Sequence, residues 1–154
     1  MEEQADGQPR ALVTENALRK ARAVEAADDE VVLGVDTAVV LDGRVYGKPG
    51  DETEAAVQLR RLSGRRHEVW SGIALCQRGA ERSSCAVTQV RFRHLEQRDI
   101  DWYLASGEWR DRAGGYAIQG RGAALVEEIE GDFWNVVGLP VYELVKLAPD
   151  LLRS

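Results

Sequence analysis

Apolar residues recur at helical spacing in two well-separated stretches of the first half of the chain. Between Pro9 and Ala27 they alternate with charged residues, which predicts an amphipathic helix. A second helix is predicted after Asp51, whose carboxylate can cap the first turn, with Glu54 three residues further on. Gly64 supplies the left-handed stop expected at its end.

The second half of the chain carries two further helical patterns. One runs from 97 to 106 and is closed by Gly107. The other is opened by Pro140 and has apolar residues on one face.

Runs rich in β-branched residues predict the strands. Val31–Asp36 is short and apolar, and we expect a buried strand that ends at Asp36, before a hairpin that turns at Asp42 and Gly43. Residues 66–79 and 83–95 predict two long strands, joined by a turn near Gly79 into an antiparallel hairpin. The second of them alternates between apolar and charged residues. One more strand is predicted within 124–132.

This order of helices and strands predicts an α/β fold with an antiparallel component and not a uniform βαβ alternation. The 154 residues contain no internal repeat and no linker rich in proline, glycine or serine, so residues 1–154 are expected to form a single domain.

Composition narrows the classes of function. Twenty Lys and Arg against 26 Asp and Glu give a net charge of −6, the wrong sign for a nucleic-acid-binding protein that depends on phosphate contacts. No stretch approaches the roughly 18 apolar residues of a membrane span, and no signal peptide is evident. We therefore expect a cytoplasmic protein that binds neither nucleic acid nor a membrane.

Cysteine and histidine are too scarce to suggest a zinc site or a nucleophilic triad. Cys76 and Cys85 flank a turn and are expected to be reduced thiols, because nothing indicates export. His67 and His94 have no partner at zinc-ligand spacing. We therefore expect any catalytic chemistry to rest on carboxylates, Lys, Arg and a hard metal cation.

Asp36 and Lys48 form the first candidate pair. Asp36 is expected at a strand end, and the hairpin can return the Lys48 ammonium beside it, where a carboxylate near a cation-bound phosphate holds magnesium or activates water. The alternatives are that Asp36 forms a turn and Lys48 is a solvated charge.

A second group of polar residues lies among glycines, where backbone can approach a ligand closely, or where the chain simply makes tight turns. These residues are Asp111, Arg112, Gln119 and Asn135.

Several motifs together resemble the Maf family, also called septum formation inhibitor proteins, along nearly the whole chain. They are D-T at 36–37, G-K-P at 47–49, L-S-G-x-x-H at 62–67, D-x-A-G-x-Y-x-I-Q-G at 111–120 and N-V-V-G-L-P at 135–140. The resemblance implies a Maf/ITPase-like fold: a mixed parallel and antiparallel sheet with flanking helices and two lobes around a cleft. It also implies a nucleoside triphosphate pyrophosphatase that releases a monophosphate and pyrophosphate with a divalent metal cation, Mg²⁺ or else Mn²⁺ or Co²⁺.

The resemblance also assigns roles to individual residues. Asp36 is similar to the family's catalytic carboxylate, a general base or metal ligand, and Lys48 to its phosphate-binding lysine. Thr37 and Gln119 match the residues found at these places in the family members that act on dTTP and UTP. A Gln amide offers donors and an acceptor to a uracil or thymine edge. The resemblance also implies that Arg65 and His67, which lie in the same segment as Ser63, bind substrate near the cleft. It implies that Glu3, together with Asp36, is a metal ligand.

One departure from the family pattern concerns the N-terminus. The family begins with a strand, an S-x-S-P-R-R loop and a helix, and Glu2 and Glu3 match an acidic pair that follows them. We therefore expect a shortened member, or a misplaced start codon, without the strongest phosphate clamp. Its exposed apolar surface favours self-association as a homodimer. Two functions stay open: hydrolysis of dTTP and UTP, or nucleotide binding with weak or no turnover in septum control.

Overall fold

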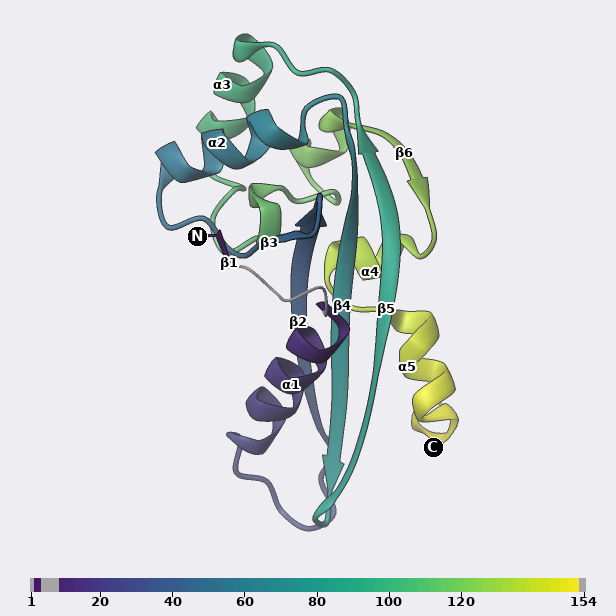
Figure 1. The fold of residues 1–154 in the computed structure, drawn as a ribbon. Helices are drawn as coiled ribbons and strands as arrows, with labels where there is room; N and C mark the ends of the chain where they lie inside the picture. The colour runs from purple at the N-terminus through teal and green to yellow at the C-terminus, as the bar shows by residue number, and fades with distance from the viewer. Residues whose placement is uncertain (1, 4–8, 153–154) are drawn as a thin grey trace.

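Three long strands form the spine of the elongated molecule (Figure 1). The computed structural model describes residues 2–3 and 9–152. The long strands are β2 (Val32–Leu41), β4 (Arg66–Gln77) and β5 (Ala80–Phe92). Three short strands, β1 (Glu2–Glu3), β3 (Arg44–Tyr46) and β6 (Val126–Glu130), complete a sheet of order β1-β3-β2-β4-β5-β6.

Every strand pair among the described residues is antiparallel. The α/β class and the flanking helices are as expected, whereas the parallel component is not confirmed. Figure 1 shows α2 and α3 at one end of the long strands and α1 along their other half, which agrees with the expected two lobes.

Five α-helices and three 3₁₀ segments are described around the sheet. The α-helices are α1 (Pro9–Arg22), α2 (Glu52–Leu62), α3 (Gln97–Ala105), α4 (Phe133–Val137) and α5 (Val141–Leu147). The 3₁₀ segments are η1 (Ala113–Gly115), η2 (Arg121–Leu125) and η3 (Pro149–Leu152). Among these described residues, no helix combines the length and apolar character needed to cross a bilayer.

The strand prediction around Asp36 is wrong in one respect. Strand β2 does not end at Asp36 but continues to Leu41, and Asp36 is paired with Gly72 of β4. Among the described strands, β3 pairs with β2 only at 39–41, so the same edge of β2 has no described strand beside it at Asp36. A charged side chain is compatible with a strand interior at such an edge.

Helix α1 lies close against the sheet because glycines stand beneath it. Val13 and Ala17 are buried on its inner face. A Cβ on Gly34 would lie 2.1 Å from the carbonyl oxygen of Ala17, and one on Gly72 would lie 2.3 Å from that of Val13. The close approach fixes the position of α1 relative to β2 and β4.

The second helix forms as its local sequence predicts. The Asp51 carboxylate accepts a hydrogen bond of 2.8 Å from the backbone N–H of Glu54, and the Glu54 carboxylate accepts one of 2.9 Å from the N–H of Gly50. Gly64, which follows the C-cap residue Ser63, has a φ of +67°. These contacts satisfy backbone groups that a helix end leaves open.

The predicted long hairpin is confirmed as β4 and β5. Its turn contains Arg78 and Gly79, both with positive φ, as a tight turn between twisted strands requires. The register pairs Cys76 with Glu81 and Cys85 with Gly72, and both thiols are free.

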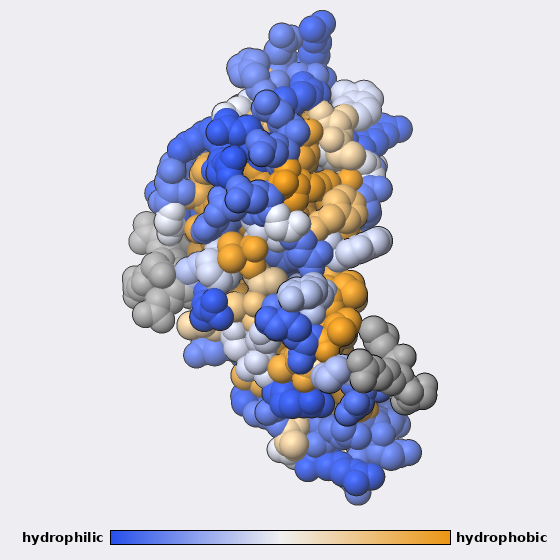
Figure 2. All heavy atoms as spheres, turned by 90° about the vertical axis from the view of Figure 1, so that its right-hand side faces the viewer, coloured by the Kyte–Doolittle hydropathy of each residue, from blue (hydrophilic) through white to orange (hydrophobic). Residues whose placement is uncertain are grey.

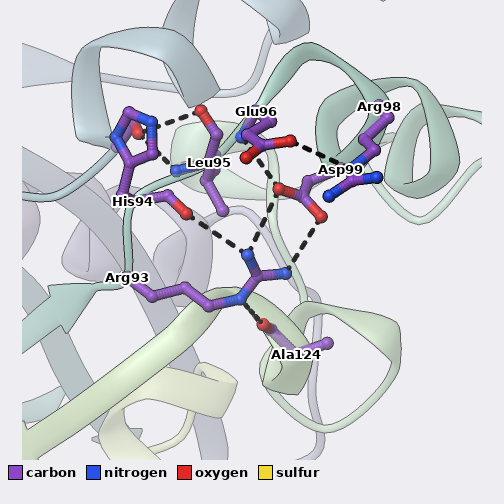
Figure 3. A network of polar contacts seen from close by, with 8 residues as sticks. Arg93, His94, Leu95, Glu96, Arg98, Asp99 and Ala124 are labelled. Carbon is purple, nitrogen blue, oxygen red and sulfur yellow. Dashed lines mark hydrogen bonds and ion pairs between the residues drawn. The ribbon is translucent and has the colours of Figure 1, made fainter.

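A polar network joins the end of β5 to α3 and to the segment before β6 (Figure 3). The Arg93 guanidinium donates to the carbonyl of Ala124 at 2.6 Å and to the carboxylate of Asp99 at 3.2 Å. Ser63 accepts from the N–H of Leu95 at 2.7 Å. Ser63 is therefore part of this structural network.

Apolar side chains reach the surface on the face that carries β5, β6, α4 and α5 (Figure 2). The large exposed apolar residues of these elements are Val87, Phe133, Trp134, Val141 and Tyr142. The association of two copies into a homodimer, expected from the sequence, stays a prediction, and so does the cytoplasmic location.

Candidate active site

A cavity of about 310 Å³ lies where the edge of β2 meets two loops. The walls are formed by β2, β4 and the segments 111–119 and 136–139, with Lys20 and Lys48 at the rim. The lining residues are Lys20, Val35, Asp36, Thr37, Val39, Lys48, Val69, Asp111, Arg112, Ala113, Tyr116, Gln119, Val136, Val137, Gly138 and Leu139. Asp36, Thr37, Lys48 and Gln119 are thus brought together.

A larger and more apolar cavity, of about 740 Å³, lies between the start of α1 and the sheet. It is lined by Arg10, Trp70 and Cys85 among others, and contains none of the predicted site residues. A catalytic site is recognised by convergent polar and titratable groups and not by volume alone, so the smaller cavity is the candidate.

The alternation of β2 divides its side chains between the two faces of the sheet. Asp36 contacts helix α1 on one face. Thr37 lies on the opposite face, where its hydroxyl is 3.9 Å from the position of a Cβ on Gly138. The cavity is nevertheless lined by both residues.

Two residues of α1 hold the Asp36 carboxylate. Lys20 Nζ donates to Oδ1 at 2.9 Å, and Asn16 Nδ2 donates to Oδ2 at 3.1 Å. Lys20 also donates to the carbonyl of Val35 at 3.2 Å. The Asp36 side chain keeps 18% of its surface exposed, so the carboxylate is oriented but still accessible.

The loop that carries Lys48 is tied to the loop that carries Asp111 and Arg112. The carbonyl of Gly47 accepts from the N–H of Gly114 at 3.3 Å and from the buried Gln58 amide at 3.4 Å. This confirms that the hairpin returns Lys48 to the same cavity as Asp36.

The buried part of the cavity wall is apolar and forms what we call the apolar slot. Val39 and Val69 come from the sheet, Tyr116 from the glycine-rich loop, and Val136 and Leu139 from the segment around α4. An apolar slot with a few convergent polar groups is the usual form of a small-molecule site.

Asn135 is buried beneath this slot and does not line it. Its Nδ2 donates to the carbonyl of Val69 at 3.1 Å and to the hydroxyl of Thr88 at 2.9 Å. Its backbone carbonyl accepts from Ser71 Oγ at 3.3 Å. Asn135 therefore anchors α4, which the sequence patterns do not predict, against β4 and β5.

The structure does not place His67 at the cavity. It is 1% exposed, and its Nε2 lies 2.7 Å from the hydroxyl of Tyr116, which does line the cavity. Burial lowers the pKa of His67 to about 3 and raises that of Tyr116, so both are neutral near pH 7. The expected contact between His67 and substrate is replaced by a contact with Tyr116.

One other predicted residue, Arg65, is not brought to the cavity. Arg65 forms an ion pair with Asp42 and lines a separate hollow with Tyr46 and Arg61. Glu3 lies in β1, and its side chain lies outside the described part of the structure.

The two carboxylates at the cavity are suited to bind a magnesium ion whose remaining ligands would come from the phosphates of a substrate. Within residues 2–3 and 9–152, as far as side chains are described, no group of three or more His, Cys, Asp or Glu forms a ready-made metal cage. Mg²⁺ commonly uses only one or two carboxylates together with substrate phosphates. Asp36 and Asp111 both line the cavity and supply such donors.

Asn16, Lys20 and Ser71 are candidate site residues that the sequence patterns do not single out. Asn16 and Lys20 are one helical turn apart, which puts them on the same side of α1. Their spacing in the sequence could have indicated that they act together. Their common hydrogen-bond partner, Asp36, becomes apparent only when α1 is packed on the sheet.

Comparison with known proteins agrees with this geometry. Residues 1–151 match the family described as Maf-like protein. Proteins named dTTP/UTP pyrophosphatase from Symbiobacterium thermophilum and Moorella thermoacetica are 50% and 53% identical to the chain. Each alignment covers 90% of this chain, and 72% and 73% of the respective relative. One of the same name from Pyrococcus furiosus is 45% identical over 87% of this chain and 73% of its own. With the motif residues Asp36, Thr37, Lys48 and Gln119 gathered at one cavity, the chain belongs to the Maf-like protein family.

Proposed function

We propose that this chain hydrolyses dTTP and UTP to the nucleoside monophosphate and pyrophosphate. The observation that carries the proposal is the meeting of Asp36, Lys48, Thr37 and Gln119 around one cavity. The relatives named dTTP/UTP pyrophosphatase, 45% to 53% identical to this chain, support the same activity.

The two parts of the cavity suit the two parts of a nucleotide. The pyrimidine ring occupies the apolar slot, with Thr37 and Gln119 as its polar contacts. The phosphates lie toward the rim, where Lys48, Lys20 and Arg112 offset their charge. Charge-assisted hydrogen bonds of this kind are stronger than neutral ones.

Asp36 is the general base of the proposed reaction. Its carboxylate, oriented by Asn16 and Lys20, takes a proton from a water molecule. The water oxygen bonds to the α-phosphorus as the bond to the bridging oxygen breaks, and pyrophosphate leaves with that oxygen. Lys48 stabilises the charge that develops on the departing phosphates.

We also propose a divalent cation at the rim, Mg²⁺ or else Mn²⁺ or Co²⁺, with Asp36 and Asp111 as its protein ligands. When bound, such an ion stabilises negative charge on phosphate oxygens and lowers the pKa of bound water. The presence of Asp36 and Asp111 in the same cavity as Lys48 and Arg112 supports this assignment.

Turnover across nucleotides tests the activity. The purified chain is incubated with dTTP, UTP, CTP, GTP and 7-methyl-GTP with Mg²⁺, and pyrophosphate and orthophosphate are measured separately. We expect pyrophosphate from dTTP and UTP, and its loss in EDTA with recovery on adding Mg²⁺. Faster turnover of GTP or 7-methyl-GTP, or orthophosphate as the first product, contradicts the proposal. Tight binding of UTP without any product supports the alternative of a nucleotide-binding protein.

A further inference from the structure

A chain of hydroxyl groups leads from the cavity into the core. Thr37 Oγ1 lies 2.9 Å from Ser71 Oγ, and Ser71 Oγ lies 3.3 Å from the backbone carbonyl oxygen of Asn135. Ser71 and Asn135 are both fully buried, whereas Thr37 is partly exposed and lines the cavity. Thr37 is thus the end of the chain that a ligand can reach.

Counting hydrogens fixes the direction of these bonds. A carbonyl oxygen only accepts, so the single hydroxyl hydrogen of Ser71 is donated to Asn135. The contact between Thr37 and Ser71 then requires Thr37 to be the donor. The hydrogen of Thr37 points away from the cavity, and its oxygen offers only lone pairs to a ligand.

The Asn135 carbonyl that orients this chain is itself held firmly. It also accepts from the N–H of Gly138 at 3.1 Å, and the Asn135 side chain is bonded to Val69 and Thr88. Thr88 in turn donates to the carbonyl of Asp132 at 3.2 Å. The acceptor at the inner end is therefore anchored on β4, on β5 and on the N-cap of α4.

We propose that Ser71 is a positioning residue that selects the base by fixing the Thr37 hydroxyl as a hydrogen-bond acceptor. The inference rests on the proposed function and narrows its substrate class to nucleotides whose base offers an imide N–H, as uracil and thymine do. Cytosine has an unprotonated ring nitrogen at the same place. The lone pair of this nitrogen would face a lone pair of the Thr37 hydroxyl oxygen, which is unfavourable. Ser71 itself does not touch the base.

Binding in the absence of turnover tests this selection. The dissociation constants of UTP and CTP are measured by calorimetry in EDTA for the wild-type chain and for Ser71→Ala. The Ala variant frees the hydrogen of Thr37 to turn toward the cavity. We expect the preference for UTP over CTP to fall about tenfold, the scale of one hydrogen bond.

Three further variants keep the test decisive. Thr37→Ser retains the hydroxyl and should retain the preference. Ser84→Ala removes a serine hydroxyl bonded to Glu143 at 2.7 Å, away from this cavity, and should also leave the preference unchanged. If Ser71→Ala does not fold, Ser71→Cys replaces the hydroxyl with a weakly bonding thiol of similar size and should lower the preference.

The outcomes separate this inference from the proposed function. An unchanged preference in the folded Ser71 variants, or a wild-type chain that does not distinguish UTP from CTP, overturns the role of Ser71. A wild-type chain that prefers UTP but releases no pyrophosphate contradicts the proposed hydrolysis. In that case the Ser71 variants still decide how the base is selected.

Discussion

The imidazole of His67 and the phenol of Tyr116 form one buried unit behind the cavity. Nε2 and the phenolic oxygen are 2.7 Å apart, and Phe92 packs edge-on against both rings. Tyr116 belongs to the glycine-rich loop that also carries Gln119, so this contact joins strand β4 to a wall of the cavity. The other ring nitrogen of His67, Nδ1, is buried without a hydrogen-bond partner among the described residues.

Stability should fall in acid because of His67. Burial lowers its pKa from 6.5 to about 3, so between these values the unfolded chain binds a proton that the folded chain does not. The contribution of neutral His67 is fully present above pH 6.5 and is lost as the pH falls toward 3. The slope reaches about 1.4 kcal/mol per pH unit inside that window.

Urea unfolding at a series of pH values between 7 and 4 measures this slope. His67→Gln has no group to titrate there, and its curve should be flatter than that of the wild type. His94 is exposed, and His94→Gln is the matched control that should keep the wild-type slope. Equal slopes for His67→Gln and the wild type would show that other groups dominate acid unfolding.

Asp36→Asn should remove most turnover and preserve the fold. The amide has nearly the same shape but cannot accept the proton of the attacking water, and the loss expected for a general base is roughly 10²- to 10⁴-fold. Pyrophosphate release under saturating UTP measures the loss, with circular dichroism as the test of folding. Asp150→Asn changes an exposed carboxylate of η3 and should leave turnover unchanged. Near-wild-type turnover in a folded Asp36→Asn variant would exclude Asp36 as the base.

Lys48→Ala should act mainly on nucleotide affinity. Losing one charge-assisted contact to phosphate weakens binding by about ten- to a hundredfold. Titration of UTP in EDTA measures the change. Lys146→Ala removes an exposed lysine of α5, which lies near Glu143 and does not line this cavity. The two variants should therefore differ, and equal affinities would assign the phosphates to other residues.

The sequence predicts best the elements whose determinants are local. Helix α2 has its cap at Asp51 and its stop at Gly64, and the β4–β5 hairpin has its turn at Gly79, all within a few residues of the element they define. The motif order likewise predicted that Asp36 and Lys48 share one site, and both residues line the same cavity. The resemblance to a family supplied the roles of these residues, which the periodicity of the sequence alone does not give.

The sequence predicts poorly what depends on packing between distant segments. Asp36 interrupts an apolar run and is predicted to end its strand. In the structure it lies where β2 has no neighbour on one side among the described strands, and α1, 16 to 20 residues earlier, supplies Asn16 and Lys20. The family resemblance implies a place near the substrate for His67, but His67 pairs with Tyr116, 49 residues away. Helix α4 is only five residues long, too short for a periodic pattern to reveal.

The glycines under α1 give a last prediction, which links packing to the site. A Cβ on Gly34 would lie 2.1 Å from the Ala17 carbonyl oxygen, and one on Gly72 would lie 2.3 Å from that of Val13, so either Ala variant must push the helix away. Overpacking of this kind costs about 1–3 kcal/mol of unfolding free energy. Because α1 also carries Asn16 and Lys20, turnover should fall together with stability.

Gly47→Ala provides the control for this effect. A Cβ there meets nothing within 4 Å, and the residue does not have a positive φ, so its free energy of unfolding should stay within about 0.5 kcal/mol of the wild type. Chemical denaturation of the three variants gives the comparison. If Gly34→Ala and Gly72→Ala were as stable as Gly47→Ala, α1 would not lie this close to the sheet, and its contacts with Asp36 would lose their structural basis.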